Sequence, residues 1–210
     1  MIVTPFHALS ILKKYPGLYA LLLFLFSACN YSGEGQGSAS LQTDAADKDT
    51  TLILQTGQSV VQLLKTHQYR ELAAYVHPEL GLRCSPYAFV DTINDVILMQ
   101  DDLENNNGEK LLWGYYDGTG DPIMLNMEGY FKQFVYDRNF METSSVSINK
   151  FIGKGNSVNN LQAAYPGCDF IEYYISGTED NPDWRALRLV FQQYQGKLFL
   201  TGIVYDQWTI

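Results

Sequence analysis

Two strand-like apolar runs flank a short polar break near the end of the chain. They cover residues 184–191 and 197–205, and the break between them ends in Gly196. A Gly-ended break between two such runs is typical of a β-hairpin. The pattern therefore predicts a C-terminal hairpin over residues 184–208.

Apolar positions repeat at helical spacing in three earlier segments. Residues 51–66 and 69–76 each place apolar side chains on one helical face, and residues 127–134 follow the i, i+3, i+4, i+7 pattern. Asn126 is a suitable N-cap for the third helix, and Pro78 ends the second. Two short helices therefore open the domain, and a third lies in its middle.

The remaining segments are extended or irregular. Residues 91–108 fit either a short strand followed by a helical turn or a loop, and the Gly- and Asp-rich residues 117–122 predict a turn. Strands are expected over residues 81–90, 111–116, 145–152 and 170–176. Helices followed by a run of strands predict an α+β class.

Residues 1–28 have the layout of an export signal. Lys13 and Lys14 precede an apolar run over residues 18–26. That run is about half of the ~20 residues that a membrane-spanning helix needs, and small residues follow it. We therefore expect residues 1–28 to be a signal peptide.

The end of this leader, Leu25-Phe26-Ser27-Ala28-Cys29, resembles the lipobox of bacterial lipoproteins. The resemblance implies that Cys29 carries a lipid, with acyl chains such as palmitate, and anchors the protein to the cell envelope. The residue after Cys29 is Asn30 rather than Asp, which favours the outer membrane. The alternative is an ordinary signal peptide that contains a cysteine.

Residues 29–50 are nearly free of apolar bulk, with Gly, Ser and Asp prominent. Such a composition predicts a flexible tether. Residues 51–210 then form a single α+β domain, because no interior linker or repeat divides them.

The order of elements from residue 51 to 208 resembles the NTF2-like fold. The resemblance implies N-terminal helices packed on a bent antiparallel sheet, which together form a cone. Phrases such as Trp113-Gly-Tyr-Tyr-Asp-Gly-Thr-Gly-Asp-Pro-Ile and Leu187-Arg-Leu-Val-Phe also resemble an uncharacterised family of secreted bacterial domains. That family has no assigned catalytic residues, so it transfers no role to this chain.

Charge excludes one class of partner. The formal net charge is −9, from 23 acidic and 14 basic residues. Two of the basic residues, Lys13 and Lys14, belong to the leader, so the rest of the chain is more acidic still. An acidic surface repels phosphate groups, so nucleic acid and anionic lipid are poor partners.

Candidate chemistry is sparse. Cys84 and Cys168 either form a disulfide after export or stay free thiols. His67 and His77 are the only histidines after the leader, and no ligand spacing predicts a metal site. We identify no catalytic motif and expect no cofactor.

Counting residue pairs across the predicted strands gives a candidate pocket. A loop at residues 194–196 places Arg188 opposite Gly202 and Trp184 opposite Asp206, and a loop at 177–183 places Glu172 opposite Arg188. One sheet face would then carry Glu172, Tyr174, Trp184, Arg188, Gly202 and Asp206, with Val190, Leu200 and Val204. The core-facing side would carry Ile171, Tyr173, Ile175, Leu187, Leu189, Phe191, Phe199, Ile203 and Tyr205.

The charged face has two interpretations. It lines a ligand pocket with aromatic walls, or it holds a cross-strand ion pair on a solvated surface, and we favour the ion pair. We accordingly expect a non-enzymatic binding or accessory module for a small ligand or another envelope protein. The alternatives are an isomerase or hydrolase that uses Asp206 or Glu172 as a base beside Tyr174, and a structural spacer.

Overall fold

The structure is a computed structural model that describes residues 39–106, 108–143, 145–153, 155, 157–178 and 183–209, with side chains from residue 49 onward. The predicted signal peptide, Cys29 and residues 29–38 of the predicted tether lie outside these residues. Residues from Ala39 onward form one compact unit.

The described residues form one long helix, several short ones and two sheets, which confirms the α+β class. The helices are α1 (Ala39–Lys65), α2 (Tyr69–Ala73), α3 (Gln100–Glu104), α4 (Met127–Phe134) and α5 (Leu161–Ala164), with a 3₁₀ turn, η1 (Phe140–Glu142). The strands are β1 (Leu82–Ser85), β2 (Val96–Leu98), β3 (Lys110–Tyr115), β4 (Pro122–Asn126), β5 (Ser145–Ile148), β6 (Asp169–Ile175), β7 (Arg185–Tyr194) and β8 (Lys197–Gln207).

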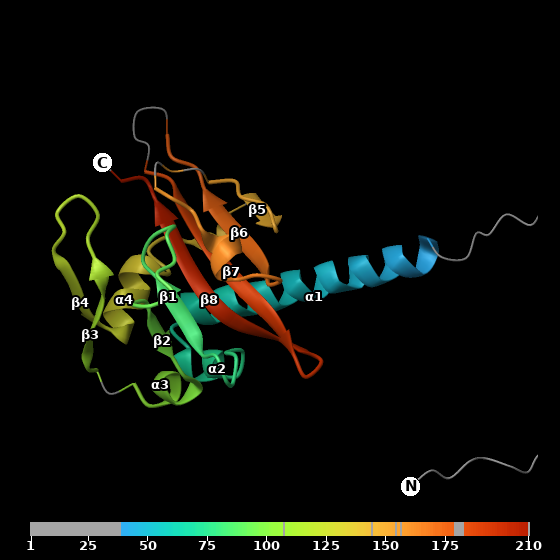
Figure 1. Cartoon of the computed structure of the whole chain (residues 1–210), viewed down its shortest axis with the longest axis horizontal. Helices are drawn as coiled ribbons and strands as arrows, with labels where there is room; N and C mark the ends of the chain where they lie inside the picture. Colours follow the sequence, from blue (N-terminus) through green and yellow to red (C-terminus); the bar gives the residue numbers. More distant parts are fainter. Residues whose placement is uncertain are drawn as a thin grey trace, which may run out of the picture. The chain divides into compact units, whose positions relative to one another are not determined.

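Six of the strands form one sheet in the order β2-β1-β8-β7-β6-β5, and β3 and β4 form a separate two-stranded sheet (Figure 1). Strand β1 runs parallel to β8, whereas the other neighbours in the large sheet are antiparallel. The prediction of a wholly antiparallel sheet is therefore wrong at β1. Strands so distant in sequence share no tight turn, so no local pattern fixes their relative direction.

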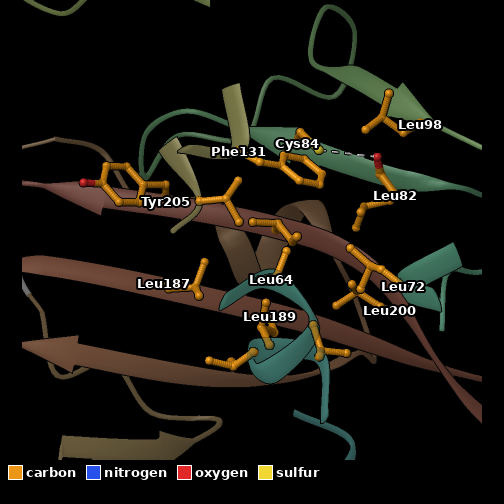
Figure 2. Close-up of a cluster of buried hydrophobic side chains, with 14 of the residues drawn as sticks. Leu64, Leu72, Leu82, Cys84, Leu98, Phe131, Leu187, Leu189, Leu200 and Tyr205 are labelled. Carbon is orange, nitrogen blue, oxygen red and sulfur yellow. Dashed lines mark hydrogen bonds between the residues drawn. The ribbon is translucent and has the colours of Figure 1, made fainter. Parts of the chain in front are cut away.

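Helix α1 begins at Ala39, so residues 39–50 are helical rather than part of a flexible tether. This correction has a local cause, because the segment contains three Ala and one Leu, which favour helices despite its low apolar bulk. Further along the same helix, Val60, Val61 and Leu64 are fully or almost fully buried. A cluster of apolar side chains joins this face of α1 to the large sheet (Figure 2).

Gly57 sets how closely α1 approaches strand β6. A Cβ at this position would lie 2.3 Å from Ile171 Cδ1 and 2.9 Å from Tyr173 Oη. A side chain at this position would force Ile171 and Tyr173 to move, because contacts below 3 Å require a rearrangement.

The opposite face of the large sheet is covered by the segment between β5 and β6. A second apolar cluster lies there, made of Val90, Leu161, Phe170, Val190 and Val204. Both faces of the sheet are therefore buried, and the charged face was wrongly expected to be solvated.

The two cysteines after Cys29 lie on different sides of this sheet. Cys84 belongs to the cluster under α1, whereas Cys168 packs against the second cluster. Both are free thiols. The possible disulfide between them is therefore absent, because the sheet separates the two side chains.

The C-terminal hairpin turns at Gln195 and Gly196, which have φ angles of +49° and +75°. Two consecutive residues with positive φ form a tight two-residue hairpin turn, shorter than the predicted three-residue loop. The register also shifts by one residue between Val190 and Phe191. Such a β-bulge places two residues of one strand opposite one of the other.

These two differences change the cross-strand partners. Arg188 pairs with Val204 rather than Gly202, and Asp206 pairs with Ala186 rather than Trp184. Beyond the bulge Leu200 pairs with Phe191, and both side chains belong to the core. The predicted faces of Leu200 and Phe199 are therefore exchanged. On strand β6 the predicted register is observed, with Glu172 opposite Arg188.

Candidate functional site

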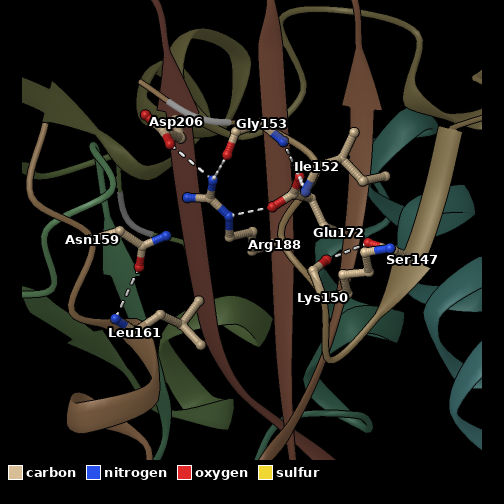
Figure 3. A network of polar contacts seen from close by, with 9 residues as sticks. All are labelled: Ser147, Lys150, Ile152, Gly153, Asn159, Leu161, Glu172, Arg188 and Asp206. Carbon is tan, nitrogen blue, oxygen red and sulfur yellow. Dashed lines mark hydrogen bonds and ion pairs between the residues drawn. The ribbon is translucent and has the colours of Figure 1, made fainter. Parts of the chain in front are cut away.

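A network of three charged side chains lies on the sheet face opposite α1. Arg188 Nε donates to Glu172 Oε2 at 2.6 Å, and Arg188 Nη2 donates to Asp206 Oδ2 at 2.8 Å. The three residues come from the adjacent strands β6, β7 and β8 (Figure 3). Strand alternation therefore brings together Glu172, Arg188 and Asp206 as one charged triad.

The triad also holds the chain segment that covers it. Glu172 Oε1 accepts hydrogen bonds from the backbone N–H groups of Ile152 at 2.7 Å and Gly153 at 2.6 Å. The guanidinium of Arg188 lies 5.2 Å from the centre of the Phe151 ring, a cation–π distance. Residues 151–153 are thus fixed to the sheet by the same charges that link its strands.

Burial of this network is almost complete. The side chains of Glu172 and Arg188 are 0% exposed and that of Asp206 is 4% exposed. Burial raises the pKa of Asp206, and the Arg188 charge opposes that rise only in part. Arg188 Nη1 has no hydrogen-bond partner among the described residues.

Tyr174 and Trp184, the two aromatic residues of the predicted pocket, lie beside the triad. Their ring centres are 6.1 Å apart. A Cβ on Gly155 would lie 3.1 Å from the Trp184 ring and 3.7 Å from Asp206 Oδ1, so the chain passes directly over both side chains. The five predicted pocket residues therefore gather in one place, but packed protein covers them.

A second charged network lies on the other face of β7, and the sequence analysis did not identify it. Arg185 Nε donates to Asp137 Oδ2 at 3.0 Å, and the Tyr205 hydroxyl donates to the same oxygen at 2.8 Å. Burial, and then the nearby Asp137 charge, raise the pKa of Tyr205. The side chains of Arg185 and Asp137 are 15% and 17% exposed.

This second network is incomplete within the described protein. Asp137 Oδ1 is buried and has no hydrogen-bond partner among the described residues. A buried acceptor without a donor costs about 1–3 kcal/mol. A ligand or water that donated to this oxygen would recover part of that free energy.

A groove of about 530 Å³ lies beside this network, and we call it the Arg185 groove. It is lined by Tyr116, Leu125, Gly129, Lys132, Gln133, Phe134, Asp137, Arg185 and Gln207. Its volume lies in the range of about 300–1,000 Å³ that small-molecule sites occupy. No residue of the charged triad lines it.

A signal for the Arg185 groove does exist in the sequence, although it is weak. Asp137 and Arg138 directly follow the apolar face of helix α4, and Arg185 follows Trp184 at the start of β7. Asp137 and Arg185, which contact each other, are 48 residues apart in the sequence. Only the packing of α4 against the sheet brings them together.

The described part of the chain contains no group of three His, Cys, Asp or Glu side chains that could hold a metal ion. Of the described helices, none is long and apolar enough to cross a bilayer. No protein-family model, curated protein or solved structure matches the chain.

Proposed function

We propose that this protein is lipid-anchored through Cys29 to the bacterial cell envelope, with the outer membrane favoured. We further propose that its domain is a non-enzymatic binding module of NTF2-like architecture. The lipobox-like residues 25–29 support the anchor. The burial of α1 and α4 side chains in one cluster with the large sheet supports the architecture.

The single observation that carries the binding role is the contrast between a closed triad and an open groove. A general base must come within about 2.6–3.2 Å of the proton it removes. Both oxygens of Glu172 already accept hydrogen bonds from protein donors, and Asp206 is bound to Arg188 beneath covering chain. This geometry disfavours the isomerase or hydrolase alternative.

The Arg185 groove supports a binding module over a structural spacer. It places two cations, Lys132 and Arg185, beside one carboxylate, Asp137, with apolar walls at Leu125 and Phe134. This arrangement suits a small ligand that carries an anionic group, an apolar part and a hydrogen-bond donor for Asp137.

The lipid anchor is tested by labelling cells with radioactive palmitate. We expect label in the wild-type protein and none in Cys29→Ser, and we expect globomycin to make the precursor accumulate. An unlabelled wild-type protein that is processed normally in globomycin would show an ordinary signal peptide instead.

The binding role is tested by saturation-transfer NMR of the full chain in detergent with a library of small carboxylates. We expect some of them to bind and Lys132→Ala to weaken their binding by about 3–10-fold, as for loss of one hydrogen bond of ordinary strength. The matched control is Lys197→Ala, at the distant hairpin turn. Absence of binding, or equal weakening by both variants, would contradict the proposal.

A further inference from the structure

Strands β2 and β3 lie next to each other but belong to different sheets (Figure 1). Strand β2 is the end strand of the six-stranded sheet, and β3 pairs only with β4 among the described strands. Each strand therefore keeps one edge that takes part in neither sheet. The backbone N–H and C=O groups of such an edge can pair with another strand.

A groove of about 660 Å³ borders these two strands, and we call it the β2–β3 groove. All three residues of β2 line it, together with residues of α3 and β3. The groove therefore borders both strands.

The groove is apolar along its strands. Leu98 of β2 and Met127 at the start of α4 are buried, whereas Ile97 of β2 and Leu112 of β3 are 41% and 43% exposed. Exposed apolar side chains that line a groove together, rather than singly, are typical of interaction sites.

The rim of the groove is acidic. Asp101, Asp102 and Glu109 line it, and none of its described lining residues is Lys or Arg. One oxygen of Asp102 accepts the backbone N–H of Met99 at 2.7 Å, which fixes that carboxylate at the start of α3. Charge complementarity therefore selects a positively charged occupant.

The other sheet edges differ from this one. Strand β4 begins with Pro122, which has no backbone N–H to donate, and β5 at the far end of the large sheet borders neither groove. Open strand edges, exposed apolar residues and uniform charge coincide at the β2–β3 groove.

We propose that the β2–β3 groove binds an extended segment of a partner protein in which apolar residues alternate with Lys or Arg. Such a segment adds as a strand to the edge of β2 or β3. Main-chain hydrogen bonds supply affinity in this mode, and alternate side chains supply specificity. The apolar side chains of the segment contact Ile97 and Leu112, and its basic side chains meet Asp101 and Glu109.

The contact is short. The three residues of β2 span about 10 Å at 3.3 Å per residue. So short a strand supports few hydrogen bonds, and we expect a dissociation constant of about 10–500 μM, a transient contact rather than an obligate one.

The test uses the full chain in detergent and a fluorescein-labelled peptide, Lys-Val-Lys-Val-Lys-Val-Lys, measured by fluorescence anisotropy. The comparison peptides carry Glu in place of Lys, the same residues in two blocks, or N-methyl groups on alternate amides. We expect each change to weaken binding by about tenfold or more, because charge, alternation and backbone pairing are all required.

Variants locate the contact. Binding of the basic peptide should weaken by about 3–10-fold in Ile97→Lys. We expect the same loss in the double variant that combines Asp101→Asn with Glu109→Gln. The matched control, Val146→Lys, adds the same charge to an exposed residue of the far edge strand β5 and should have no effect. Hydrogen exchange of the backbone amides of residues 96–98 and 110–113 should slow only when the peptide is present.

Three results would overturn the proposal. An N-methylated peptide that binds as well as the parent would show attraction to the acidic surface without strand pairing. Equal weakening by Ile97→Lys and Val146→Lys would place the contact elsewhere. Failure of the basic alternating peptide to bind would remove the groove as a docking site.

Discussion

Arg185 and Arg188 lie three residues apart on β7 and meet carboxylates in different ways. Their side chains point to opposite faces of the sheet, because successive residues of a strand alternate. Arg188 lies under residues 151–153, fully buried between Glu172 and Asp206. Arg185 lies at the rim of a groove, and its partner Asp137 keeps one oxygen without a described partner.

This difference separates a structural use of charge from one suited to recognition. A fully buried ion-pair network lies out of reach of a ligand, and it specifies how strands and covering chain fit. A partly exposed pair beside a groove keeps binding capacity, because water or a ligand can still reach it. The networks of Arg188 and Arg185 therefore both pair an arginine with a carboxylate but differ in role.

The largest expected effect comes from Arg188→Met. The change leaves Glu172 and Asp206 buried without their cation, so the free energy of unfolding should fall by about 3–5 kcal/mol. Urea denaturation of both proteins at pH 7 measures the change. A loss below about 1 kcal/mol would mean that water reaches the triad.

Arg185→Met should destabilise the domain less, by about 1–2 kcal/mol. Asp137 then still accepts the Tyr205 hydroxyl, and its partial exposure lets water replace part of the lost contact. The same urea experiment measures it. An effect equal to that of Arg188→Met would remove the distinction between the two networks.

Asp206→Asn should cost at most about 1 kcal/mol at pH 7, because the amide oxygen can still accept from Arg188 and Glu172 still balances the buried Arg188 charge. The same variant should change the pH dependence. The pKa of Asp206 is raised in the folded state, so its protonation stabilises the fold at low pH, and this stability is lost as pH rises through the folded pKa.

The contribution of Asp206 has to be measured as the difference in pH dependence between the wild type and Asp206→Asn. Burial also raises the pKa of Asp95, to about 6, which gives a dependence of the same sign. Stability curves from pH 4 to 7 should therefore be flatter for Asp206→Asn than for the wild type, while both keep the part due to Asp95. Identical slopes would show that Asp206 has an ordinary pKa.

The smallest effect is expected for Arg138→Met. Arg138 forms a pair with Asp183 at 3.6 Å, and both side chains are 40% exposed or more. Such pairs contribute about 0–1 kcal/mol, so we expect a change below about 0.5 kcal/mol by urea denaturation. A larger loss would show that exposure is a poor guide to the role of arginines in this domain.

The sequence predicted the triad better than it predicted its surroundings. Strands β6 and β7 pair without a bulge, so counting from the loop correctly placed Glu172 opposite Arg188. The bulge in β7–β8 and the tight turn together moved the partner of Arg188 by two residues, from Gly202 to Val204. An even shift keeps a residue on its face, so Asp206 stays on the predicted face, where the structure shows it bonded to Arg188.

Other features depend on packing between distant segments. The segment that holds Phe151 and Gly153 buries the triad, and nothing in its composition indicates that it covers a sheet. Asp137 meets Arg185 only because α4 packs beside the ends of β7 and β8. Likewise, Leu200 and Phe199 exchanged faces because a bulge has no local signature in a continuous apolar run.

The most direct test measures both arginines in one sample. Hydrogen exchange of the Nε–H groups of Arg188 and Arg185 can be followed by ¹⁵N NMR, before and after adding the small carboxylates. We predict slow exchange and no shift for Arg188, and faster exchange with a ligand-dependent shift for Arg185. Equal exchange rates, or a ligand-dependent shift at Arg188, would contradict the division between a structural network and a binding groove.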